Sequence, residues 1–278
     1  MNKNNILFVI LAYTFFWGLI AIGLVLLLAG VLPGEETPIN ITVTICSWTP
    51  TIALLVLFKK LYPGSSVKGF YQNAFKERLN IALVLTVVIV QVLIVVAAAC
   101  LVAYSEKTSL RGLFDFSFST IGAGFLWSLV QGATGEESGW RGFLQPSIEK
   151  KSGVINSSLI VGVIWGFWHA PLWFATSGFA GKELLQYIAC FMLMVVSVAI
   201  IIGICYNRCR NLFIPILIHF MFNFLFKMFT GELLGFFTRV VVFYALAAIG
   251  YIVWHKRKIK RKQEIFKENS VNIANNDL

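Results

Sequence analysis

Long apolar segments constrain this chain more than any other feature. A helix needs about 20 residues to cross the roughly 30 Å hydrocarbon core of a bilayer. Runs that approach this length lie at approximately 6–31, 39–58, 80–103, 119–145, 155–175, 184–206, 211–229 and 233–254. Hydrophobic residues make up 58% of the sequence, more apolar surface than one water-soluble core could hide. The sequence predicts an all-α fold, a polytopic bundle of about eight transmembrane spans with a conical polar cavity open toward the cytoplasmic side.

Lysine and arginine are concentrated in every second loop between these segments. The basic stretches lie at 59–78, 150–151, 208–210 and 256–262, and the loops between them carry fewer cations. Because cytoplasmic loops carry the excess of Lys and Arg, we predict a multi-pass protein of the plasma membrane with both termini cytoplasmic. The net charge of +10 reflects this asymmetry, and the basic tail is expected near anionic lipid headgroups. Nucleic acid is not an expected partner.

The chain divides into three predicted parts. Residues 1–110 form a transmembrane scaffold of three almost wholly apolar spans, residues 117–226 carry nearly all of the polar residues within spans, and residues 233–278 hold the last span and a basic cytoplasmic tail. No repeat of fixed period joins the two halves.

Polar residues in the fourth, fifth and seventh spans are paired at a spacing of four. The pairs are Glu137 with Arg141, Trp165 with His169, and His219 with Asn223. Residues four apart share one face of a helix. At ~1.5 Å per residue the three pairs overlap in depth in the cytoplasmic half of the bilayer. They could therefore line one cavity, which would have to admit water to solvate the carboxylates.

The adjacent carboxylates Glu136 and Glu137 have a structural and a functional interpretation. In the structural one, Arg141 neutralises one of them and the other is protonated. In the functional one, Arg141 holds Glu137 ionised and oriented, while Glu136 points about 100° away along the helix and acts on water as a general base. The reverse division of roles is left open at this point.

The two histidines within predicted spans also have a structural and a functional interpretation. His169 lies among aromatic residues, where a lone histidine is often structural, but His219 with Asn223 one turn later favours a functional pair that orients water or donates to an oxyanion. Together with Glu136, these histidines are also candidate ligands for a divalent metal such as zinc. There is no His-Glu-x-x-His signature, so the spacing alone does not establish a metal site.

The three motifs together resemble those of the CPBP family, the CAAX-protease and bacteriocin-processing group of intramembrane proteases. The sequence EESGWR at 136–141 is similar to the family's EExxxR motif, WGFWH at 165–169 to its aromatic-xxx-His motif, and HFMFN at 219–223 to its HxxxN motif. The resemblance covers about residues 117–226. Trp165 replaces the Phe of many members and preserves an aromatic wall.

The resemblance implies an intramembrane endopeptidase of a bacterial plasma membrane. Glu136 and His169 would activate the water that attacks a peptide carbonyl, His219 and Asn223 would stabilise the oxyanion, and Glu137 with Arg141 would support Glu136. Members are described both as metalloproteases and as glutamate peptidases, so the metal stays open. The implied substrate is a peptide or membrane protein, such as a leader peptide, pheromone precursor or bacteriocin-related peptide.

Two other functions are compatible with these residues. One is a non-enzymatic bacteriocin-immunity or scaffold protein that keeps the motifs. The other is a proton- or cation-coupled transporter, because buried Glu and His residues also build proton relays. The absence of a repeat between the halves speaks against a transporter.

Overall fold

The computed structural model describes residues 1–31 and 36–276 and consists of helices. Residues 32–35, in the predicted first loop, and 277–278, at the end of the predicted tail, lie outside the described part. The α-helices are α1 (Lys3–Leu28), α2 (Glu36–Ser47), α3 (Thr49–Val56), α4 (Phe58–Leu61), α5 (Val67–Ala74), α6 (Ile81–Glu106), α7 (Phe118–Ser128), α8 (Thr134–Glu137), α9 (Gln145–Trp168), α10 (Ala170–Ala175), α11 (Gly181–Cys209), α12 (Phe213–Lys227) and α13 (Leu233–Asn276). Shorter turns are η1 (Leu110–Leu113), and the π-helical η2 (Leu129–Ala133) and η3 (Ser138–Leu144). The predicted all-α membrane helix bundle is confirmed.

Some of the predicted spans are single long helices and others are built from shorter pieces. Within the described residues, four helices are long and apolar enough to cross a membrane: Lys3–Leu28, Ile81–Glu106, Gly181–Cys209 and Leu233–Phe266. The second and seventh predicted spans correspond to the shorter apolar helices Ile41–Val56 and Phe213–Lys227. The total of eight spans and their orientation therefore stay predictions.

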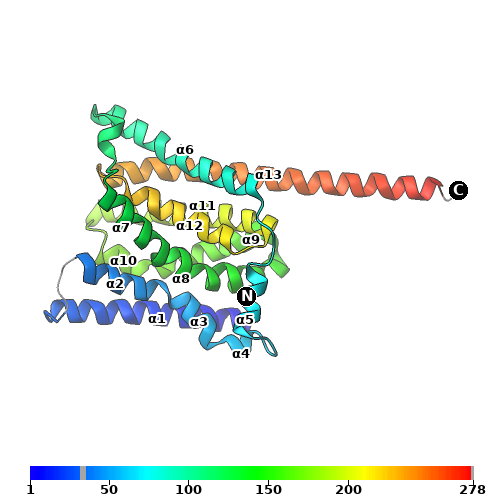
Figure 1. Ribbon diagram of the computed structural model, residues 1–278, viewed down its shortest axis with the longest axis horizontal. Coiled ribbons are helices and arrows are strands. Elements are labelled where there is room, and N and C mark those ends of the chain that lie inside the picture. Colours follow the sequence, from blue (N-terminus) through cyan, green and yellow to red (C-terminus); the bar gives the residue numbers. More distant parts are fainter. Residues whose placement is uncertain (32–35, 277–278) are drawn as a thin grey trace.

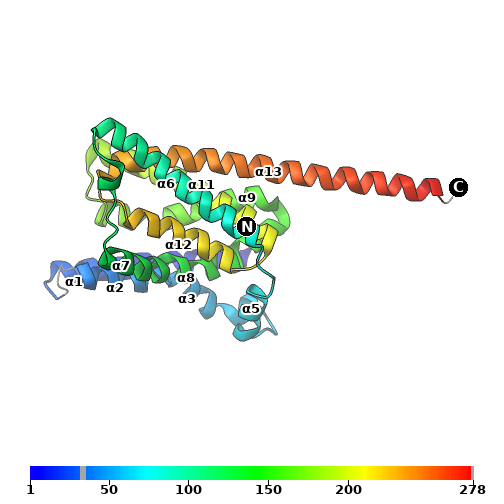
Figure 2. The same ribbon diagram turned by 45° about the horizontal axis from the view of Figure 1, so that its top comes forward.

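The helices run side by side, and the basic segments gather at one end of the bundle. Helix α11 packs along α9 and α13, α13 packs along α6, and α1 packs on α3. Helices α4 and α5 lie at the end from which α13 projects (Figures 1 and 2). Arg210, in the turn after α11, pairs there with Glu149 of α9. We call this end the basic end and the opposite one the far end.

The fourth and fifth predicted spans are both interrupted where their polar residues lie. Between α7 and α8, Gln131 and Gly132 leave helical geometry, and Gly132 has φ +86°, a conformation that favours glycine. Helix α9 ends at Trp168 and α10 begins at Ala170, so His169 lies at a junction beside Pro171. Pro171 has no backbone N–H to donate, which explains a break at this point. Each break places a polar side chain where the helix direction changes.

Candidate active site

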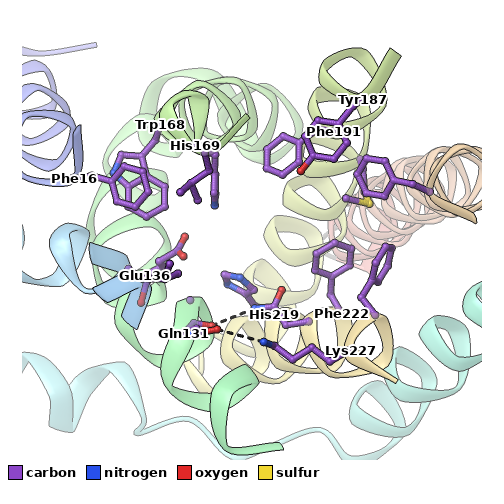
Figure 3. Close-up of a pocket in the computed structure, with 18 of the residues that line it drawn as sticks. Phe16, Gln131, Glu136, Trp168, His169, Tyr187, Phe191, His219, Phe222 and Lys227 are labelled. Atoms are coloured by element: carbon purple, nitrogen blue, oxygen red, sulfur yellow. Dashed lines mark hydrogen bonds between the residues drawn. The ribbon is translucent and has the colours of Figure 1, made fainter. Parts of the chain in front are cut away.

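A cavity of about 340 Å³ inside the bundle brings together four of the predicted site residues. Glu136, His169, His219 and Asn223 all contribute to its wall, and Figure 3 shows Glu136, His169 and His219 around one open space. The remaining wall is largely aromatic. Three other predicted residues are not in the wall but lie behind it: Trp165 contacts Glu136, Glu137 contacts His219, and Arg141 contacts Glu137.

Glu137 is the centre of a buried ionic group. Its Oε1 accepts a hydrogen bond from Arg141 Nη1 at 3.0 Å and another from His219 Nδ1 at 2.7 Å, and Glu137 and Arg141 are fully buried. The first contact confirms the predicted pairing, and the second was not predicted. Because an ionised carboxylate only accepts hydrogen bonds, Nδ1 of His219 carries a proton, and in the neutral imidazole Nε2 then keeps its lone pair. Glu137 thereby fixes both the orientation and the tautomer of His219.

Glu136 and His219 converge on the same point beside Gly132. Glu136 is buried, and its Oε2 accepts a hydrogen bond from Trp165 Nε1. A Cβ atom built on Gly132 would lie 3.1 Å from Glu136 Oε1 and 2.8 Å from His219 Nε2. Both atoms therefore face the space that the missing side chain leaves open.

His169 lies across the cavity from His219 (Figure 3). Its Nδ1 is 2.8 Å from the carbonyl oxygen of Trp165, which can only accept, so Nε2 of His169 also keeps its lone pair. Trp165 thus touches Glu136 through its indole N–H and His169 through its backbone. Its ring also lies 4.4 Å from the Arg141 guanidinium. One aromatic residue links both walls, which the prediction of a simple aromatic wall did not anticipate.

Asn223 holds the backbone at the break before the glutamates. Its Nδ2 donates to the carbonyl oxygen of Gln131 at 3.2 Å, and Lys227 Nζ donates to Gln131 Oε1 at 3.3 Å. Gln131, Gly132 and Lys227 were not among the predicted site residues. Gly132 lies close to the glutamates in the sequence, which indicated a deformable backbone there. The contacts of Gln131 span about 90 residues, so the local spacing gave no sign of them.

The chain also resembles known proteins over the segment that carries these side chains. Residues 89–225 match the family described as type II CAAX prenyl endopeptidase Rce1-like. This match supports the resemblance to the CPBP family. A protein named CAAX prenyl protease 2 from Methanococcus maripaludis is 31% identical over 112 residues, which are 39% of this chain and 41% of that protein. All three CPBP motifs lie within the matched residues.

The donor atoms in the described part of this protein do not form a metal site. Among the described residues, no group of three His, Cys, Asp or Glu side chains is placed to hold a metal ion. Glu136 Oε1 and His219 Nε2 face one point beside Gly132, but His169 lies across the cavity, so the three do not form a ligand set. Glu137 Oε1 already accepts from Arg141 and His219. The geometry therefore does not fit the zinc alternative, and no step is assigned to a metal.

The cavity of this protein extends from the site toward the far end, and the side on which it opens stays a prediction. Beyond His219 its wall continues along α12 to Lys227, along α11 to Tyr187 and onto α13 at Leu233, all near the far end. Toward the basic end, the buried side chains of Trp140 and Arg141 fill the interior.

Proposed function

We propose that this protein is an intramembrane endopeptidase that hydrolyses a peptide bond in a peptide or a membrane-associated protein. The observation that carries the proposal is the convergence of Glu136 Oε1 and His219 Nε2 beside Gly132, inside a cavity large enough for a peptide segment and water. The name of the archaeal relative, CAAX prenyl protease 2, supports the same reaction class. The aromatic wall favours substrates with apolar side chains.

In the proposed reaction, Glu136 acts as the general base. Its carboxylate takes a proton from water, and the water oxygen forms a bond to the carbonyl carbon of the substrate. Glu136 then gives the proton to the leaving amine as the C–N bond breaks. The second hydrogen of that water would bond to Nε2 of His169 or of His219, which would aim the water. Asn223 has a second amide hydrogen, beyond the one donated to Gln131, for the oxyanion.

Glu137 is a better candidate for a supporting residue than for the general base. Its Oε1 is occupied by Arg141 and His219, so proton transfer there would break a buried ionic contact. This supports the original assignment of Glu136 as the base over its reverse. The proposed setting is a bacterial plasma membrane with both termini cytoplasmic and the basic part of α13 near anionic headgroups.

Purified protein in lipid, incubated with a library of apolar peptides, tests the proposed function. Mass spectrometry should detect internal cleavage that depends on the protein. Tight peptide binding without cleavage by correctly folded protein would contradict the proposal and support the immunity or scaffold alternative instead.

A chelator should not affect cleavage. Because no three side chains of the described part are placed to hold a metal, EDTA treatment followed by dialysis is expected to leave kcat unchanged within about twofold. The measurement is cleavage rate before and after treatment, with metal content checked by elemental analysis. A loss of rate that zinc restores would show that the ligand set rearranges to bind metal.

Replacing Trp165 with phenylalanine should slow cleavage without removing the aromatic wall. The variant keeps the ring beside Arg141 but removes the N–H that donates to Glu136, and hydrogen bonds to charged groups contribute roughly 1.5–3 kcal/mol. We expect kcat to fall by about tenfold or somewhat more. Trp173→Phe is the matched control, since the buried Trp173 N–H has no hydrogen-bond partner among the described residues. Equal rates for the two variants would contradict the role given to this contact.

A further inference from the structure

The two breaks that carry Glu136 and His169 both release backbone carbonyl groups. At the first break, the amide of Thr134 donates to Leu129 O, so Val130 O lacks the partner it would have in a regular helix. At the second, the amide of Leu172 donates to His169 O, so Trp168 O is released in the same way. A carbonyl without a partner is costly in a membrane, where no water can bind it, so each break needs a donor from elsewhere.

In both cases the donor is an indole N–H from the N-terminal part of the chain. Trp48, at the junction of α2 and α3, donates to Val130 O at 3.0 Å. Trp17 of α1 donates to Trp168 O at 3.0 Å. The two acceptors lie six residues before Glu136 and immediately before His169, respectively. Two tryptophans from the predicted apolar scaffold therefore satisfy the two backbone positions that set the direction of these side chains.

The surrounding packing makes each contact part of a fixed interface. A Cβ atom on Gly135 would lie 2.8 Å from Trp48 Cδ1, so α8 lies directly against the indole ring beside the glutamates. On the other side, the Phe16 and Trp168 rings have centroids 3.8 Å apart, and Trp168 Nε1 donates back to Ala12 O at 3.2 Å. Helix α1 and the end of α9 thus hold each other through reciprocal hydrogen bonds.

We propose that Trp17 and Trp48 are positioning residues, which aim His169 and Glu136 by holding the carbonyl groups of the two helix breaks. The inference rests on the proposed peptidase function and extends it to a part of the chain outside the family match at residues 89–225. Helix α1 and the junction of α2 and α3 then complete the site. Neither tryptophan touches the reacting atoms.

Trp17→Phe and Trp48→Phe test this proposal because each keeps an aromatic ring and removes only the donor. We expect each to lower kcat about tenfold with KM within about twofold, and the double variant to lower kcat by about the product, since the breaks lie on opposite walls. Trp173→Phe is the control that removes an N–H without a partner in the described part. A general structural role would lower the unfolding temperature and the amount of active protein while leaving kcat per folded molecule unchanged.

Amide hydrogen exchange supplies a second measurement that does not depend on activity. Exchange should become faster at residues 129–137 in Trp48→Phe and at 166–173 in Trp17→Phe, with the rest of the bundle unchanged. Suppose that the wild type cleaves peptide and that both variants match the Trp173→Phe control in kcat and in exchange. That result would overturn the positioning proposal and leave the peptidase proposal standing. If the wild type cleaves no peptide, the peptidase proposal fails, and exchange alone then decides whether the tryptophans hold the breaks.

Discussion

Glu136→Gln should reduce peptide hydrolysis by about 10²- to 10⁴-fold, the usual contribution of a general base. Glutamine has nearly the same shape and still offers an oxygen to Trp165 Nε1, so the wall of the cavity should be preserved. It cannot take a proton from water. The measurement is kcat for a peptide that the wild type cleaves, with the unfolding temperature recorded in the same lipid. That temperature should stay unchanged or rise, because the substitution removes a buried charge.

Glu137→Gln provides the informative contrast. It leaves Arg141 and His219 facing a neutral amide inside the bundle, and breaking a buried ionic contact typically costs about 3–5 kcal/mol. We expect loss of both stability and cleavage from Glu137→Gln, but loss of cleavage alone from Glu136→Gln. The exposed Glu183, in the first turn of α11, is the control position for a glutamate-to-glutamine change. A stable, inactive Glu137→Gln beside an active Glu136→Gln would reverse the assigned roles.

Local sequence spacing predicted the contacts that one helix makes within itself. The Glu137–Arg141 pair followed from a separation of four residues. Long apolar runs likewise predicted a helix bundle in a membrane. These features depend on helical geometry alone, so no knowledge of the packing was needed.

The contacts that assemble the site depend on packing between helices and could not be read from spacing. Glu137 meets His219 across 82 positions, and Trp48 meets Val130 across the same separation. Nothing in the sequence distinguishes Trp48 from the other tryptophans of apolar spans. The three pairs could be assigned to a shared depth, but the rotation of each helix about its axis decides which atoms converge. Packing between helices sets that rotation, for example where Gly135 and Gly139 lie against residues 47–50.

Gly132→Ala should abolish cleavage although it changes no ionisable residue. The position has φ +86°, which side chains rarely adopt, and the new methyl group would lie 2.8 Å from His219 Nε2 and 3.1 Å from Glu136 Oε1. It would therefore occupy the space where water and the substrate carbonyl are proposed to meet. Displacements of about 1 Å in reacting groups can cost on the order of 10²-fold in rate, so we expect a loss of at least that size.

Gly153→Ala separates this effect from backbone strain. Gly153 also has a positive φ, +73°, but no atom lies within 4 Å of the position of its Cβ, and it lies in α9 away from the cavity. Both substitutions should cost about 1–3 kcal/mol of stability through the same conformational strain. Only Gly132→Ala should lose cleavage per folded molecule, measured as kcat beside the unfolding temperature. Equal kcat values for the two variants would mean that the space beside Glu136 and His219 is not where the reaction takes place, because a methyl group there would then obstruct nothing.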